Sequence, residues 1–128
     1  MHIQTSVQPD YLWVVASGRF TLQGAKTSFL EMLDHAAWYR AERILFDGRK
    51  LRGHVHESER ILYGDFVGRA ASAFYKKQLT ASAPKFAYIL PETILDPKRM
   101  GETLAVNRGM LVKAFDNLPD ATAWLGAG

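Results

Sequence analysis

Residues 107–125 read NRGMLVKAFDNLPDATAWL, and their pattern indicates the fold class. The triplet Asn107-Arg108-Gly109 is typical of a helix end, because Arg108 adds a cation to the last turn and Gly109 adopts the left-handed conformation readily. The mostly apolar run Met110–Phe115 predicts a short strand buried on both faces. A helix followed at once by a buried strand is the pattern of an α/β protein.

The end of this stretch predicts a short helix. Asn117 can cap it by accepting backbone N–H bonds, Pro119 is tolerated in its first turn, and Asp120 favours its positive end. Its apolar residues recur at spacings of three and four, at Leu118, Ala121, Trp124 and Leu125. This face must dock on the rest of the protein.

The first forty residues predict a β-hairpin and then a helix. Ile3–Val7 alternates weakly and suits an edge strand, whereas Tyr11–Gly18 is rich in aromatic and β-branched residues and predicts a strong strand. Thr21 can cap a helix that runs to about Arg40. One face of this helix carries Leu22, Ala25, Phe29, Met32, Leu33 and Ala36.

The central part repeats strand and helix. Arg43–Asp47 and Lys85–Leu90 predict buried strands, and a polar loop over residues 48–57 follows the first of them. Ser58 is a good cap for a long helix from about Glu59 to Leu79. The core face predicted for that helix carries Leu62, Phe66, Ala70, Ala73 and Phe74. A further helix is predicted from about Met100 to Arg108.

The predicted order is therefore β-β-α-β-α-β-α-β-α over one domain, residues 1–128. Strands that alternate with helices require crossover connections, so we expect a mainly parallel sheet of about five strands with helices packed against it. The opening hairpin adds an antiparallel pair and makes the sheet mixed.

Composition narrows the class of protein. The chain has no cysteine, which removes disulfides and a cysteine nucleophile and fits a reducing cytoplasm. No apolar run approaches the roughly 20 residues of a membrane span, and no signal peptide is visible at the N-terminus. The net charge is only +3, with 16 Lys and Arg against 13 Asp and Glu. We expect a cytoplasmic protein with no stable membrane insertion and no nucleic-acid partner.

Three segments resemble a known family. They are ILFDGRKLRG at residues 44–53, RILYG at residues 60–64, and the closing helix–strand–helix of residues 107–125. Together with the element order they resemble the STAS, or SpoIIAA-like, fold of anti-sigma-factor antagonists and its CRAL-TRIO-related branch of small bacterial proteins. The resemblance implies a SpoIIAA-like sheet and a non-enzymatic regulatory or ligand-binding module.

The resemblance also implies two possible site chemistries. Anti-sigma-factor antagonists carry a phosphorylated serine at the start of the helix after this strand, and Ser58 lies near that place as a possible phosphoacceptor. Its neighbours Glu57 and Glu59 would repel a phosphate, and helix capping alone also explains a serine here. CRAL-TRIO domains imply instead an apolar cavity for a lipid-like ligand, which makes a lipid or hydrophobic-metabolite carrier the alternative function.

Four residues are the predicted ligand- or partner-binding site. Arg60 and Arg108 would bind an anionic head group or a partner carboxylate, and Tyr63 and Asn107 would supply orienting hydrogen bonds. Bonding at helix ends and crossovers is the competing interpretation for all four. We expect no cofactor, a protein partner or a small amphipathic ligand, and a homodimer.

A metal-dependent enzyme is the lower-ranked alternative. His54 and His56, with Glu57 and Glu59, could contribute to a metal site, but a lone His-x-His pair in a polar loop is usually solvated. No nucleophile-elbow or phosphate-loop motif is present. Asp47 ends a buried strand, where α/β proteins bind ligands, or else it pairs with a nearby arginine or backbone amides. We therefore expect no metal site and no catalytic residue.

Three further features stay open on the sequence alone. Gly64 and Gly68 begin a small-residue stripe that lets another backbone approach, either from this chain, a second subunit or a ligand. Trp38 is either exposed at an interface or folded back over the sheet edge. Ile94 and Leu95 belong either to an apolar lid or to a packed loop.

Overall fold

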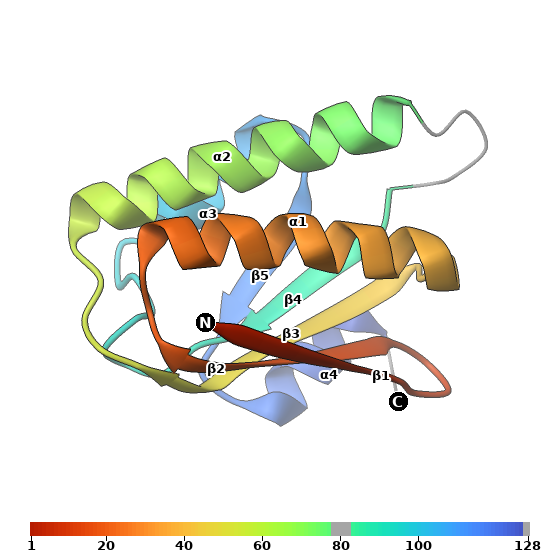
Figure 1. Ribbon diagram of the computed structural model, residues 1–128, viewed down its shortest axis with the longest axis horizontal. Helices are drawn as coiled ribbons and strands as arrows, with labels where there is room; N and C mark the ends of the chain where they lie inside the picture. Colours follow the sequence, from red (N-terminus) through yellow and green to blue (C-terminus); the bar gives the residue numbers. More distant parts are fainter. Residues whose placement is uncertain (78–82, 127–128) are drawn as a thin grey trace.

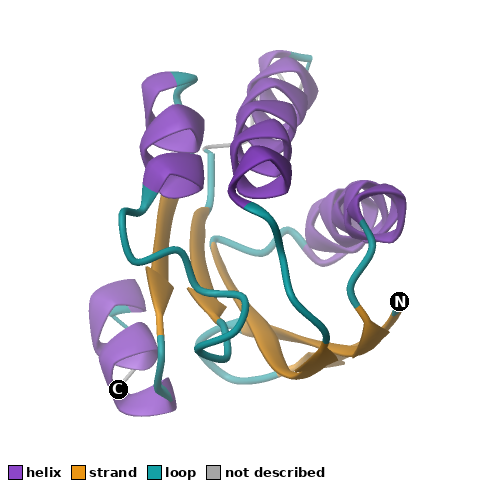
Figure 2. Ribbon diagram, turned by 90° about the vertical axis from the view of Figure 1, so that its left-hand side faces the viewer, coloured by secondary structure: helices purple, strands orange, loops and turns teal. Residues whose placement is uncertain are grey.

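The computed structural model describes residues 1–77 and 83–126. It is an α/β fold with a five-stranded mixed sheet and helices on both faces (Figures 1 and 2). The elements in chain order are β1 (His2–Val7), β2 (Leu12–Arg19), α1 (Leu22–Tyr39), β3 (Arg43–Arg52), α2 (Glu57–Lys76), β4 (Lys85–Ile89), α3 (Met100–Asn107), β5 (Leu111–Phe115) and α4 (Leu118–Leu125).

The strands lie in the sheet in the same order as in the chain. β1 and β2 form the expected antiparallel hairpin, and β2, β3, β4 and β5 run parallel to one another. Crossovers between neighbouring parallel strands are right-handed, so α1, α2 and α3 all lie on one face of the sheet. The C-terminal helix α4 lies on the opposite face (Figure 2).

The capping residues predicted for α1 and α4 are confirmed. The Thr21 hydroxyl accepts a hydrogen bond from the Gly24 amide at 3.0 Å, and the Asn117 side chain accepts one from the Asp120 amide at 2.9 Å. Gly109 has a φ of +98°, so the turn between α3 and β5 uses the conformation that glycine allows.

The apolar faces predicted for these two helices are also confirmed. Phe29, Met32 and Leu33 of α1 are fully buried in the main core. On the other face of the sheet, Ala121 and Leu125 of α4 form a second core with the strand residues Leu45, Ala87 and Ile89.

The segment between β3 and α2 differs from the prediction. β3 continues to Arg52 because Lys50, Leu51 and Arg52 still pair with β2 beyond an irregularity in the register. α2 begins at Glu57 with His56 as its N-cap, and the Glu59 carboxylate accepts a hydrogen bond from the His56 amide at 3.1 Å. Ser58 therefore lies in the first turn and does not cap the helix. The predicted helix end at Leu79 lies outside the described residues.

The prediction that the last strand is buried on both faces is wrong. β5 starts at Leu111, whose side chain is half exposed, and its other residues are exposed or only partly buried. β5 pairs with β4 and stands at the edge of the sheet, so one side of the strand lacks a strand neighbour.

The core face predicted for α2 is wrong in part. Leu62 and Ala73 are exposed, and Phe66, Ala70 and Phe74 are only partly buried. The buried residues of the helix are Gly64, Val67, Gly68 and Ala71. The small-residue stripe is therefore the inner face of α2, because α3 packs against it within the same chain.

No helix in the described part of the chain combines the length and the hydropathy that a membrane crossing requires.

Candidate ligand-binding site

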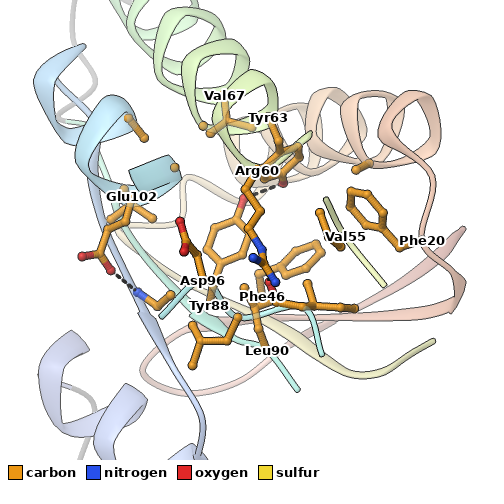
Figure 3. Close-up of a pocket in the computed structure, with 18 of the residues that line it drawn as sticks. Phe20, Phe46, Val55, Arg60, Tyr63, Val67, Tyr88, Leu90, Asp96 and Glu102 are labelled. Carbon is orange, nitrogen blue, oxygen red and sulfur yellow. Dashed lines mark hydrogen bonds between the residues drawn. The ribbon is translucent and has the colours of Figure 1, made fainter. Parts of the chain in front are cut away.

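A cavity of about 110 Å³ lies at the carboxyl ends of the parallel strands, between the sheet and the helices α2 and α3 (Figure 3). Open α/β sheets bind ligands at this end of their strands. Most of the lining is apolar and comes from Met1, Phe20, Ala25, Phe46, Leu51, Val55, Val67, Leu90, Ile94, Leu95, Ala105, Val112 and Ala114. The cavity thus offers an apolar enclosure to a small molecule.

Arg60 is a cation at this cavity. Its Nε donates a hydrogen bond to the Ile94 carbonyl at 3.1 Å, and its Nη2 approaches the Thr93 carbonyl at 3.5 Å. Among residues 1–77 and 83–126, no carboxylate lies within 4.0 Å of the guanidinium. Figure 3 shows the side chain reaching from α2 toward the other labelled lining residues. Arg60 therefore tethers the segment after β4 and forms no ion pair with the part of the chain that the structure describes.

Two tyrosine hydroxyls meet in the same cavity. Tyr63 lies one turn after Arg60 on α2, and its hydroxyl is 3.0 Å from that of Tyr88 at the end of β4 (Figure 3). The Tyr88 ring packs on Phe46 with ring centroids 4.6 Å apart, and the Tyr63 ring meets Phe29 edge-on. Burial raises the pKa of both tyrosines well above the usual value, so both hydroxyls keep their protons.

The far wall of the cavity is held by charged groups that bond to one another. Arg99, at a φ of +53°, donates from Nη1 to the Glu102 carboxylate at 3.1 Å and to the Ala114 carbonyl at 2.6 Å. Glu102 also accepts a hydrogen bond from the Ala114 amide at 2.7 Å, which is drawn in Figure 3. These bonds join the start of α3 to β5.

Asp96 has a similar structural role. Its carboxylate accepts hydrogen bonds from the backbone amides of Lys98 at 3.0 Å and Met100 at 2.8 Å, at the start of α3. Ile94 beside it is buried and lines the cavity, so this apolar segment packs over the site in the present conformation.

The four predicted site residues fall in two places. Arg60 and Tyr63 both line the cavity. Asn107 and Arg108 lie at the other end of α3, where Asn107 is exposed and the Nε of Arg108 is 3.1 Å from the Asp65 carboxylate. The structure therefore brings together half of the predicted set.

Ser58 and the histidine candidates lie around the start of α2. Ser58 is exposed in the first turn between Glu57 and Glu59, and its phosphorylation stays a prediction. In the described ranges, no three histidine, aspartate or glutamate side chains gather in a way that could hold a metal ion.

Asp47 is buried outside the cavity and pairs with Arg49. Its carboxylate accepts hydrogen bonds from Nε and Nη2 of Arg49, at 2.9 and 2.7 Å, and from the indole N–H of Trp13 at 3.2 Å. Burial alone would raise the pKa of Asp47, but these hydrogen bonds outweigh it and hold the pKa below the usual value. Its role is the arginine pairing that the sequence offered as one of two interpretations.

The sequence analysis did not identify four polar residues of the cavity, namely Tyr88, Asp96, Arg99 and Glu102. Tyr88 could have been identified as a polar site residue, because a tyrosine in an apolar strand is buried and a buried phenol usually has a hydrogen-bond partner. The spacing of Arg99 and Glu102 also predicts a contact, because residues three apart on a helix can form an ion pair. Neither pattern indicates which residue of a distant segment Tyr88 or Glu102 will bond to.

No protein-family model and no curated protein matches this chain. The functional inference therefore depends on the cavity and its polar groups.

Proposed function

We propose that the protein is a non-enzymatic module that binds a small amphipathic acid. The apolar part of the ligand would occupy the cavity, and its carboxylate would lie on Arg60. The observation that carries this proposal is a guanidinium beside an apolar cavity that forms no ion pair with any residue the structure describes. Hydrogen bonds between arginine and a carboxylate are stronger than bonds between neutral groups.

The size of the cavity favours a small ligand over a lipid. An engineered apolar cavity of about 150 Å³ in another protein holds one benzene molecule. The cavity here, at about 110 Å³, is smaller than that and suits an acyl chain of a few carbons. A carrier of long lipids would need the segment over the cavity to move away, which would break the bonds from Arg60 to Thr93 and Ile94.

A titration with hexanoate and hexanol tests the role of Arg60. The two probes share an apolar chain, and only hexanoate carries a charge. We expect Arg60→Gln to weaken hexanoate binding by roughly tenfold, because a hydrogen bond to a charged group contributes about 1.5–3 kcal/mol. Binding of hexanol, measured by NMR titration, should change little.

Arg69→Gln is the matched control, because Arg69 is on the same helix, is exposed, and pairs with Asp65 away from the cavity. It should leave the affinities of both probes unchanged. Equal losses for hexanoate and hexanol in Arg60→Gln would mean that Arg60 only shapes the cavity. A wild-type protein that binds neither probe would refute the proposed function.

We further propose that the fold is of the STAS, SpoIIAA-like type and that the module works in the cytoplasm. Two features of the sheet support this assignment: its strands lie in the order of the chain, and the first two form an antiparallel hairpin. The motifs at residues 44–53 and 107–125 support it as well. The lack of cysteine fits a reducing compartment.

A regulatory role through protein contacts, including a homodimer, is the second candidate. α1 persists to Tyr39, so Trp38 stands out from its end with 82% of its surface exposed. Tyr39 and Val7 are also exposed and line one shallow hollow beside it. Exposed aromatic residues are enriched where proteins bind one another.

Native mass spectrometry tests the homodimer. We expect the wild-type protein to be a dimer and Trp38→Ser to be mainly a monomer, because a central tryptophan often contributes 2 kcal/mol or more to association. Leu62→Ser, at another exposed apolar position, is the control and should remain dimeric. A monomeric wild-type protein would exclude the homodimer.

A further inference from the structure

The paired hydroxyls of Tyr63 and Tyr88 contain one more hydrogen than their mutual bond uses. Each phenol carries one O–H donor and can also accept. The bond between them, at 3.0 Å, consumes one of the two hydrogens. Within residues 1–77 and 83–126, neither oxygen makes another hydrogen bond to the protein. One O–H is therefore left to donate at the cavity that both residues line.

Burial makes it favourable for this O–H group to find a hydrogen-bond acceptor. Tyr88 is only 5% exposed, and aromatic rings surround the pair. A buried donor without an acceptor costs free energy, so a ligand with an oxygen at this point gains relative to a pure hydrocarbon. The donor thus adds a polar requirement to an otherwise apolar enclosure.

The acceptor that suits this position is uncharged. A carboxylate loses much hydration energy in an apolar environment unless a cation compensates it. The cation is Arg60, which is less buried than Tyr88. The carboxylate therefore belongs at Arg60, and a carbonyl oxygen suits the tyrosine pair.

We propose that the ligand is a short oxo acid, with its carboxylate on Arg60 and its carbonyl oxygen accepting a hydrogen bond from the Tyr63–Tyr88 pair. This inference rests on the proposed function. Arg60 and Tyr63 are three residues apart on α2, a rise of about 4.5 Å along the helix. The two side chains therefore lie on the same face of α2, and both line the cavity, so one short ligand can contact both.

The test compares 5-oxohexanoate with hexanoate, which has the same chain length and lacks the carbonyl. We expect the wild-type protein to bind 5-oxohexanoate about fivefold more tightly, within the range of a neutral hydrogen bond. In Tyr63→Phe/Tyr88→Phe the ratio of the two dissociation constants should fall to one or reverse, because no phenolic donor remains. Either single variant keeps one O–H, so the double variant is required.

Tyr75→Phe is the matched control, because Tyr75 is another partly buried tyrosine of α2 and does not line the cavity. It should preserve the fivefold preference. A second measurement needs no variant. In the wild-type protein, the ¹³Cζ signals of Tyr63 and Tyr88 should shift more with 5-oxohexanoate than with hexanoate.

The outcomes separate the two proposals. Tighter binding of the oxo acid that disappears in the double variant supports the inference. Equal binding of the two acids by the wild-type protein, or a preference that survives in the double variant, overturns the inference and leaves the proposed function intact. Should neither acid bind, the proposed function and this inference both fail. If the double variant does not fold, equal ¹³Cζ shifts with the two acids overturn the inference.

Discussion

Gly64→Ala should lower the free energy of unfolding by about 3 kcal/mol, the largest effect that we expect from a single methyl group in this protein. A Cβ at position 64 would lie 2.5 Å from the Cα and 2.6 Å from the carbonyl carbon of Gly101. Both are backbone atoms, so no side-chain rotation can relieve the overlap. α2 and α3 would have to separate, and the Arg99 and Glu102 bonds at the start of α3 would be disturbed.

The sign of this effect makes it a strict test. In an exposed helix interior, replacing glycine with alanine stabilises by roughly 1 kcal/mol, because alanine has the higher helix propensity. Urea unfolding followed by circular dichroism measures the difference. Leu62→Ala, at an exposed position of the same helix, should change stability by about 0.5 kcal/mol or less. An increase in stability of Gly64→Ala would show that the two helices do not pack this closely.

Asp47→Asn should cost about 2 kcal/mol at neutral pH. The carboxylate is buried and accepts hydrogen bonds from Arg49 and Trp13, and hydrogen bonds to a charged group contribute about 1.5–3 kcal/mol. An asparagine keeps the shape of the side chain but not the charge. Asp65→Asn is the control, because Asp65 forms its ion pairs at the surface, and it should cost much less.

The Asp47 effect should also depend on pH. The pKa of Asp47 in the folded protein lies below the usual value of an aspartate, so the folded state favours the ionised form. The stability that this carboxylate contributes is therefore fully present above about pH 5 and is lost as the pH falls through the folded pKa. The difference between wild type and Asp47→Asn should stay constant from pH 7 to about pH 5 and shrink below about pH 4. A difference that does not shrink in acid would mean that the charge does not stabilise the fold.

The sequence predicted helix caps and turns correctly where the hydrogen-bond partner lies a few residues away in the chain. The caps at Thr21 and Asn117 and the turn at Gly109 bond to residues within a few positions, so their chemistry is readable from the sequence. The inward face of α1 was also readable, because its large apolar residues all lie on one stripe.

The sequence did not predict correctly which residues of α2 and β5 are buried. α2 has two possible inner faces, a stripe of larger apolar residues and a stripe of glycine and alanine. α3, more than thirty residues along the chain, selects the second one by packing on Gly64 and Gly68. Met110–Phe115 has the composition of a central strand, yet its place at the sheet edge follows from the order of all five strands.

The predicted site residues are likewise correct in part: two of the four line the cavity and two do not. The sequence offered Arg60 and Tyr63 as neighbours on one helix, and the cavity contains both. It also offered Asn107 and Arg108, which the fold places at the far end of α3.

Sequence patterns alone predict the order of strands and helices, most of their boundaries and the inner faces of α1 and α4, because these depend on hydrogen bonds and periodicity within a few residues. Three features follow instead from packing between distant segments: the buried face of α2, the edge position of β5, and the contact of Tyr88 with Tyr63 beside Arg60. Those features depend on contacts between segments far apart in the chain, and the pattern of one segment does not specify which other segment will pack against it.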